Sequence, residues 1–257
     1  MRVYSWNINS IRARLERLVS WLESGRPDVV CLQELKCTDE QFPADEIAGA
    51  GYQACWFGQR SWNGVAILSR SPATDVQRGL RDDVPDEHAR VLAATVDGIR
   101  VVSVYAPNGQ AIGSPAYDYK LAWYERLRRY LDSYHASTEP LVVCGDFNVA
   151  PEARDVYDPA VWEGSTLFSP PVRLALRTLC DFGLTDTFRL HHEEGGRFSW
   201  WDYRQLAFPQ NEGLRIDHVL ATQPLAERCV AADIDREARK GKLPSDHAPV
   251  WADFEQT

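Results

Sequence analysis

The sequence predicts an α/β protein built from two layered sheets with helices on their outer sides. Strand-like runs outnumber helix-like runs, and several are rich in Val and Ile and end in Gly, Pro, Asn or Asp. Some strands follow one another directly, as across Asp97-Gly98, a dipeptide typical of a hairpin turn. Directly joined strands favour two packed sheets over a single parallel, doubly wound sheet.

Three amphipathic stretches are expected to form the helices. In residues 11–24 the apolar side chains recur on one stripe, and Gly25 follows it as a stop signal. Residues 116–135 show the same spacing, and residues 171–181 form the third stretch. The expected strands are the short apolar runs at 2–7, 28–33, 52–57, 64–69, 91–96, 100–105, 141–145, 215–221 and 247–254.

Composition narrows the class of protein. No linker or low-complexity tract interrupts the 257 residues, so we expect one domain over residues 1–257. The 44% hydrophobic content without a bilayer-length apolar stretch or a signal-peptide pattern predicts a cytoplasmic protein. The six cysteines lack zinc-site spacing and are expected to be reduced and structural. A net charge of -9 argues against a nonspecific nucleic-acid coat, but an enzyme with an acidic metal site remains compatible with it.

Polar residues collect at the ends of the strand-like runs, far apart in the sequence. Any one of them could be an ordinary turn or solvated residue, but together they suggest one shared cleft. Carboxylates, carboxamides and an imidazole favour a hard divalent cation and a phosphate over zinc. These residues are Asn7, Asn9, Glu34, Tyr105, Asn108, Asp146, Asn148, Asp217, Asp246 and His247.

Two short motifs carry the strongest of these signals. In GDFN, Gly145 is expected to let the chain turn sharply, and Asp146 and Asn148 point the same way if the segment is extended. The alternative is a strand-end turn, because Asp and Asn favour turns. In SDH a carboxylate precedes His247, whose imidazole Asp217 could orient and make more basic.

The aromatic segment FSWWDYR suggests a substrate contact. Adjacent residues of a strand alternate faces, so one of Trp200 and Trp201 must face outward. An outward indole near Arg204 and Arg215 could stack on a base or a sugar. The alternative is that these aromatic residues belong to the core.

Taken together, eight segments resemble the exonuclease III family of abasic-site endonucleases, which belongs to the endonuclease/exonuclease/phosphatase superfamily alongside DNase I. They occur in the order of the family and span the chain. Because no extension precedes the first segment, the bacterial branch is expected to be the closer match. The segments are WNIN (6–9), LQELK (32–36), NGVAILS (63–69), YAPNG (105–109), GDFNVAP (145–151), FSWWDYR (198–204), GLRIDHVL (213–220) and SDHAPV (245–250).

The resemblance implies a four-layer α/β/β/α sandwich with a Mg²⁺ cleft at one edge, where Mn²⁺ could substitute. Glu34 resembles the principal metal ligand, with Asn7 beside it. Asp146 resembles the residue that activates the attacking water or protonates the leaving oxygen. The full set of metal ligands implied in this way is Asn7, Glu34, Asp146, Asn148, Asp246 and His247.

The resemblance also assigns roles around the phosphate. Asn148 resembles the group that orients the nucleophile, and Tyr105 resembles a catalytic tyrosine near the phosphate. His247, paired with Asp217, matches a histidine that contacts a non-bridging oxygen. Asn108 resembles a phosphate contact.

The implied activity is hydrolysis of double-stranded DNA at abasic sites, with 3′→5′ exonuclease and 3′-end trimming. We expect a monomer, because an asymmetric duplex substrate needs no dimer. The expected substrate contacts are Asn108, Trp200, Arg204, Leu214, Arg215 and Ile216. Of these, Trp200, Leu214 and Ile216 are expected to wall a small apolar pocket that admits a sugar without a base. The loops at 108–118 and 152–170 are expected to set the balance of the activities.

Two other functions are compatible with part of the pattern. A phosphoinositide or sphingomyelin phosphoesterase of the same superfamily would share GDFN and SDH. The segments FSWWDYR and GLRID, and the absence of a membrane-binding stretch, favour the DNA-repair branch. A catalytically silent binding module is disfavoured because no expected catalytic position is substituted.

Overall fold

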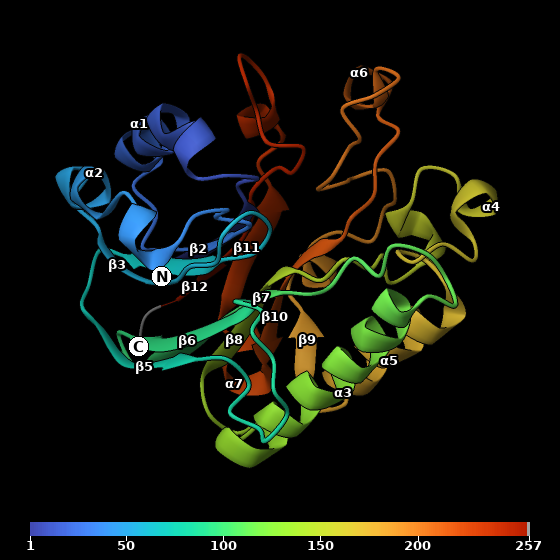
Figure 1. The fold of residues 1–257 in the computed structure, drawn as a ribbon, viewed down its shortest axis with the longest axis horizontal. Coiled ribbons are helices and arrows are strands. Elements are labelled where there is room, and N and C mark those ends of the chain that lie inside the picture. Colours follow the sequence, from blue (N-terminus) through green and yellow to red (C-terminus); the bar gives the residue numbers. More distant parts are fainter. Residues whose placement is uncertain (256–257) are drawn as a thin grey trace.

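Two six-stranded sheets lie face to face, and helices cover both outer faces (Figure 1). The computed structural model describes residues 1–255. The first sheet contains β1 (Arg2–Asn7), β2 (Val29–Gln33), β3 (Gln53–Phe57), β4 (Val65–Ser69), β11 (Cys229–Ile234) and β12 (Val250–Phe254). The second sheet contains β5 (Ala73–Arg78), β6 (Val91–Val96), β7 (Ile99–Tyr105), β8 (Leu141–Asp146), β9 (Leu184–Asp186) and β10 (Asp217–Thr222).

The helices complete the outer layers of the sandwich. The first sheet is covered by α1 (Leu15–Gly25) and α2 (Ala44–Gly49), and the second by α3 (Pro115–Tyr134) and α5 (Pro170–Cys180). The expected four-layer α/β/β/α sandwich is therefore confirmed. The shorter helices are α4 (Pro159–Trp162), α6 (Ala207–Gln210) and α7 (Gln223–Ala226). Within residues 1–255 no helix is long and apolar enough to cross a membrane.

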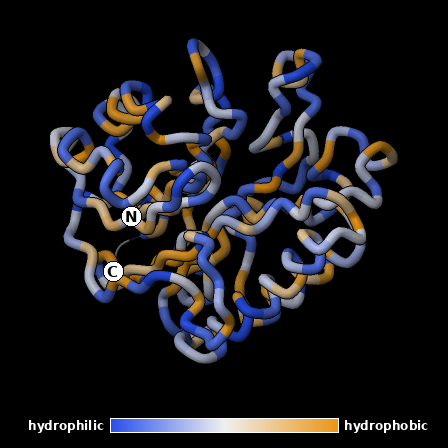
Figure 2. Tube along the Cα trace, viewed as in Figure 1, coloured by the Kyte–Doolittle hydropathy of each residue, from blue (hydrophilic) through white to orange (hydrophobic). Residues whose placement is uncertain are grey.

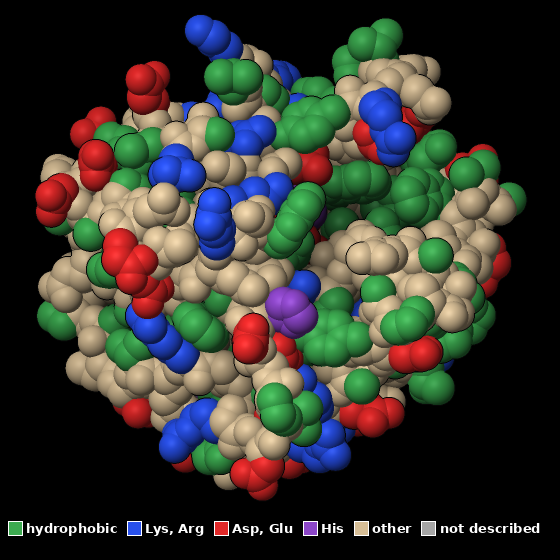
Figure 3. Space-filling model, in the orientation of Figure 1, with side chains coloured by type: hydrophobic (Ala, Val, Ile, Leu, Met, Phe, Trp, Pro, Cys, Tyr) green, Lys and Arg blue, Asp and Glu red, His purple; other side chains and the backbone are tan. Residues whose placement is uncertain are grey.

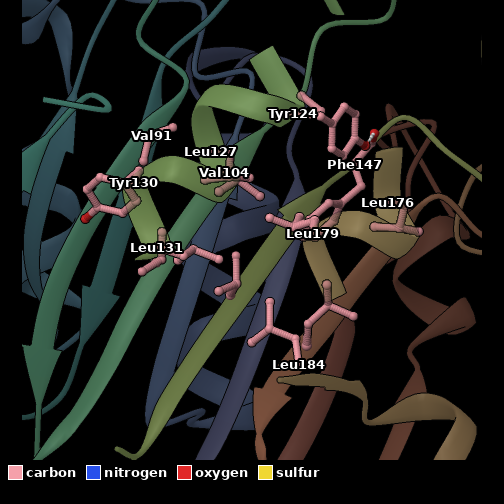
Figure 4. Close-up of a cluster of buried hydrophobic side chains, with 14 of the residues drawn as sticks. Val91, Val104, Tyr124, Leu127, Tyr130, Leu131, Phe147, Leu176, Leu179 and Leu184 are labelled. Carbon is pink, nitrogen blue, oxygen red and sulfur yellow. Dashed lines mark hydrogen bonds between the residues drawn. The ribbon is translucent and has the colours of Figure 1, made fainter. Parts of the chain in front are cut away.

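The core consists of three apolar layers, one of which lies between the first sheet and the helices α1 and α2. Aliphatic side chains from both sheets, such as Val29 and Val142, fill the space between them. Helices α3 and α5 pack on the other face of the second sheet through residues such as Leu127 and Leu176 (Figure 4). Hydrophobic residues follow the strands and the inner sides of the helices, whereas the connecting loops are mostly hydrophilic (Figure 2). Burial of these strands on both faces explains their nearly continuous apolar runs.

The principal elements lie close to the predicted ranges, but several weaker ones were missed. The stretch 11–24 forms a 3₁₀ turn at Arg12–Arg14 followed by α1, and 116–135 and 171–181 correspond to α3 and α5. Strands β5 and β11 were missed because each lies at the edge of its sheet, where β5 is largely exposed and polar and β11 is mostly only half-buried. β9 was missed because it is only three residues long. The runs expected at 215–221 and 247–254 begin later, at β10 and β12, because their first residues lead into the cleft.

The topology brings distant strand ends to one edge. The strand order is β11-β12-β1-β2-β4-β3 in the first sheet and β5-β6-β7-β8-β10-β9 in the second. β1 and β2 are parallel, as are β7 and β8, so within each pair the carboxyl ends lie together. β10 and β12 run antiparallel to β8 and β1, and Asp217 pairs with Asp146. The starts of β10 and β12 therefore meet the ends of the other four strands.

Candidate active site

A cleft of about 720 Å³ opens at this edge and draws its walls from both sheets. Figure 3 shows the hollow in the surface, with hydrophobic side chains gathered beside it. The strand-end residues that the sequence singled out and that line the cleft are Glu34, Tyr105, Asn108, Asp146, Asn148, Asp246 and His247. Asn7 and Asp217 lie directly behind them as hydrogen-bond partners.

A buried line of three charged groups forms the floor. Nδ1 of His247 lies 2.8 Å from Oδ2 of Asp217, and its Nε2 lies 3.7 Å from Oδ2 of Asp146. Ser199 Oγ donates a 2.6 Å hydrogen bond to Oδ2 of Asp217, which fixes that carboxylate from the other side. One imidazole nitrogen of His247 and one carboxylate oxygen each of Asp146 and Asp217 lie within 4.8 Å of one another, so the three could hold a metal ion.

The protonation state of His247 determines which role the Asp217–His247–Asp146 line can have in a reaction. Burial acts to lower the pKa of His247, but the negative charges of Asp217 and Asp146 outweigh burial and raise it to about 10. A protonated imidazole has no free lone pair, so it cannot bind a metal ion. The expected role of His247 as a metal ligand would require loss of this proton, which a bound cation would favour, and it stays a prediction.

Asp146 is held in a site that favours proton transfer. Burial raises the pKa of Asp146 to about 7, while the positive charge of His247 acts in the opposite direction. Its Oδ2 accepts a 2.9 Å hydrogen bond from Nδ2 of Asn7. A carboxyl group with a pKa near neutrality can accept and release a proton under physiological conditions.

The backbone around Asp146 is shaped by a close approach rather than by the turn expected at Gly145. β8 continues through Gly145, and a Cβ there would lie 1.8 Å from the carbonyl oxygen of Val104 on β7. The chain turns later, at Asn148, whose φ is 50°. The Asn148 amide N–H donates to Oδ1 of Asp146 at 2.8 Å, so the two side chains meet through a local turn and not through an extended segment.

Glu34, which follows β2, is hydrogen-bonded to side chains from both sheets. Its Oε1 accepts hydrogen bonds from the Tyr105 hydroxyl at 2.7 Å and from Nδ2 of Asn7 at 3.0 Å. Lys36 Nζ lies 2.9 Å from its Oε2. Burial and the charge of Glu34 raise the pKa of Tyr105 well above its ordinary value, so Tyr105 stays a neutral donor.

The donor set suits a hard cation. Glu34 presents a carboxylate at the cleft, and Asp246 presents another, which accepts from Asn9 at 2.9 Å and from Trp200 Nε1 at 3.1 Å. Oxygen ligands of this kind are those that Mg²⁺ and Mn²⁺ prefer. Asn7 turns its N–H toward the carboxylates, because its Oδ1 accepts from the Asn9 amide, so it acts here as a donor that bridges Glu34 and Asp146.

The expected apolar wall is present only in part. Trp201 is fully buried, whereas Trp200 is half-buried and lines the cleft, as the alternation of faces predicted. Ile216 lines the cleft together with Leu167. Leu214 is completely buried, so its expected place on the pocket surface is corrected to a position in the core.

The two arginines that were expected to contact the substrate, Arg204 and Arg215, do not line the cleft. Arg215 is 1% exposed, with Nε 2.6 Å from Asp155 and Nη2 2.8 Å from Asp186. It therefore has no surface to offer DNA, and the predicted substrate contact is corrected to a buried ion pair. Arg204 lies on an exposed loop, where it pairs with Asp202 and is not part of the cleft lining.

Other cleft residues were not predicted from the sequence. Lys36 and Asn63 lie within quoted motifs, and Arg90 lies just before β6, with its Nη1 3.1 Å from the carbonyl oxygen of Tyr105. Trp62 and His88 come from loops without a motif. A signal was available for Asn63 and Arg90, because β4 and β6 run antiparallel to β2 and β7 and begin at this edge. A signal was also available for Lys36, because it follows the end of β2 two residues after Glu34.

Comparison with known proteins identifies the family. The model of the endonuclease/exonuclease/phosphatase family matches residues 4–247. The chain belongs to this family. Exodeoxyribonuclease III of Haemophilus influenzae is 36% identical over 266 residues, which cover 99% of this chain and 100% of that protein.

Solved structures agree in fold over the whole chain. An AP endonuclease from Archaeoglobus fulgidus superimposes with a TM-score of 0.97 at 37% identity, covering 100% of both chains. A variant of the 3′ phosphatase NExo from Neisseria, bound to product DNA hairpin, superimposes with a TM-score of 0.96 at 40% identity, again covering 100% of both chains.

Proposed function

We propose that this protein is a DNA-repair phosphodiesterase that hydrolyses duplex DNA at abasic sites. We also propose that it removes nucleotides and blocking phosphates from 3′ ends. The observation that carries the proposal is the buried Asp217–His247–Asp146 line, which opens into the same cleft as Glu34. The relatives described as an exodeoxyribonuclease III, an AP endonuclease and a 3′ phosphatase support the choice of DNA.

The reaction needs an in-line water, neutralisation of charge and a stabilised leaving oxygen. Asp146 exchanges the proton with the attacking water or with the leaving oxygen. His247, kept cationic by Asp217, places positive charge against a non-bridging oxygen of the phosphate. Asn148 and Tyr105 supply neutral N–H and O–H donors that orient the phosphate, and for this the Tyr105 hydroxyl turns from Glu34 to the phosphate.

Glu34 is the residue that we propose holds the metal, with Asp246 as a second carboxylate at the cleft. Mg²⁺ is the preferred ion and Mn²⁺ a substitute, because both take oxygen ligands. A bound cation would neutralise negative charge on the phosphate. Lys36 already contacts Glu34, so this side of the cleft also holds a fixed positive charge.

The direct test is cleavage of a fluorescent duplex that contains one tetrahydrofuran abasic site, with and without EDTA. We expect cleavage with Mg²⁺, none with EDTA, and a large loss for Glu34→Gln that raised Mg²⁺ or Mn²⁺ partly restores. An intact duplex and an inositol phosphate serve as control substrates. Full activity in EDTA, or faster hydrolysis of the inositol phosphate, would contradict the proposal.

We further propose that the chain acts as a single catalytic domain, as a monomer, in the cytoplasm. Both sheets contribute to the cleft, which supports one domain. An abasic duplex has no two-fold symmetry that a dimer would match. Sedimentation with and without DNA tests the oligomeric state.

A further inference from the structure

Lys120 on α3 is completely buried behind the cleft, and within residues 1–255 its charge has no carboxylate partner at hydrogen-bond distance. Its exposed fraction is 0%, and its Nζ donates to three backbone carbonyl oxygens. The distances are 3.1 Å to Asn108, 2.7 Å to Asn148 and 2.7 Å to Thr166. The three acceptors belong to three different loops, so one side chain holds all three together.

The number of hydrogen bonds matches the chemistry of the side chain. A lysine ammonium has three N–H donors and no acceptor, and all three find a carbonyl here. Burial lowers the pKa of Lys120 to about 7, with the negative charge of Asp146 acting in the opposite direction. Burying an ammonium group is costly unless its hydrogen bonds are satisfied, so the three loops and the lysine depend on one another.

The three loops carry parts of the cleft. Asn108 and Asn148 both line it, and Thr166 immediately precedes Leu167, which also lines it. Nδ2 of Asn108 donates to Oδ1 of Asn148 at 3.2 Å, and Nδ2 of Asn148 lies 3.3 Å from Oδ2 of Asp146. A shift of either carbonyl held by Lys120 would therefore move the groups that surround Asp146.

The fit around the lysine is tight. Gly109 has a φ of +92°, and a Cβ there would lie 3.1 Å from both Lys120 Cδ and Tyr117 Cδ2. One helical turn beyond Lys120, the Tyr124 hydroxyl donates to the carbonyl oxygen of Phe147. Tyr124 and Phe147 pack in the cluster that anchors α3 to the second sheet (Figure 4). The helix is therefore a rigid support from which Lys120 reaches the loops.

We propose that Lys120 is a positioning residue for the reaction, which fixes Asn148 and Asn108 against Asp146 by bonding their backbone carbonyls. This inference rests on the proposed function, because it requires the same cleft to be active. It predicts that the lysine acts through Asn148 on turnover, and not through the affinity for DNA.

The test compares Lys120→Met with Arg128→Met, using the abasic duplex and Mg²⁺. Methionine matches the length of lysine but cannot donate. Arg128 is a matched control because it also lies on α3 and donates to a backbone carbonyl, that of Thr178, outside the cleft. We expect kcat to fall by about 10–100-fold for Lys120→Met with little change in KM, and to stay near wild type for Arg128→Met.

A double-mutant cycle with Asn148→Ala separates positioning from a general loss of structure. If Lys120 acts through Asn148, Lys120→Met should cost little further activity in the Asn148→Ala background. Additive losses, or an unchanged kcat in folded Lys120→Met, would overturn the proposal. Lys120→Gln, which keeps a buried donor, should lie between wild type and Lys120→Met. If neither variant folds, Lys120 serves the fold and the proposal is overturned.

The wild-type enzyme distinguishes this failure from failure of the proposed function. If the wild type cleaves the abasic duplex only with Mg²⁺ but the Lys120 series fails, only the positioning role is lost. If the wild type does not cleave it, the proposed function itself fails.

Discussion

Two buried carboxylates near the end of β8 have opposite surroundings. Asp155 is 0% exposed and is bound by Arg215, by Arg189 and by the amide of Glu152. Burial acts to raise the pKa of Asp155, but the charge of Arg215 and its hydrogen bond lower it below the ordinary value. Asp146 is equally buried, yet its nearest cation is His247 at 3.7 Å, and its pKa is raised.

The comparison teaches that burial of a charge does not by itself mark a functional site. Two arginines, Arg189 and Arg215, pair with Asp155, and none of the three residues lines the cleft. The charge of Asp146 is compensated only in part, and its side chain lies at the cleft. An incompletely balanced carboxyl group that contacts solvent space can exchange a proton with a substrate, whereas a balanced one stabilises the fold.

The largest expected effect concerns Asp146→Asn. Loss of the proton-transfer group should lower the cleavage rate by about 10²–10⁴-fold while DNA binding survives. At neutral pH the unfolding free energy of Asp146→Asn should be equal to or higher than that of the wild type. The folded-state pKa is raised, so ionisation of Asp146 costs stability as pH rises from about 4 toward 7. Single-turnover kinetics and urea unfolding check both. Asp155→Asn is the control, and it should lose stability. Normal turnover with weakened DNA binding would contradict the assigned role.

Next in size is the effect of Arg215→Met on stability. Removal of the arginine leaves Asp155 and Asp186 without their shared partner, which should cost about 3–5 kcal/mol of unfolding free energy. Urea denaturation measures it. A stable variant with selectively weakened DNA binding would return Arg215 to the substrate contact predicted from the sequence.

The pH dependence of turnover should reflect the pKa values of Asp146 and His247. If Asp146 accepts the proton, the rate should fall tenfold per pH unit below a pKa near 7, because the protonated form is inactive. It should fall again as His247 loses its charge near pH 10. A bound cation moves the acid limb to lower pH by favouring the ionised carboxylate. A rate independent of pH on the acid side in Mg²⁺ and in Mn²⁺ would contradict a proton-accepting Asp146.

The smallest expected effect is on selectivity. Trp200→Ala should reduce the preference for an abasic over an intact duplex, because the wall that excludes a normal nucleotide is shortened. Sensitivity to EDTA should be unchanged. Trp200→Phe keeps the wall but removes the hydrogen bond to Asp246, so it should retain the preference. If the alanine variant discriminates normally, the selective pocket lies elsewhere.

The sequence predicted the sandwich and most of the floor of the cleft because both depend on local patterns. Buried strands leave apolar runs, and Asp146 and His247 stand where those runs end or begin. The placement of Arg215 could not be predicted, since its position beside Asp217 in the chain does not show which face it points to. Its partners, Asp155 and Asp186, lie on other segments, and only the fold brings them together.

The cleft residues that lie on loops also could not be predicted from the sequence. Trp62 and His88 line the cleft, but nothing in their local sequence distinguishes them from ordinary surface residues. Gly145 was interpreted as a turn residue, whereas its role depends on the distance to β7, a neighbour known only from the structure. Sequence patterns thus indicate which residues end strands, but not which loops cover them.

The order of the strands has a consequence for how the enzyme is synthesised. The first sheet is completed only when β11 and β12 join β1, after the whole second sheet has emerged. A nascent chain that has reached β10 already contains Glu34 and Asp146, but it lacks Asp246 and His247. Such a chain therefore lacks part of the proposed catalytic cleft, which is completed only when β1 pairs with β12.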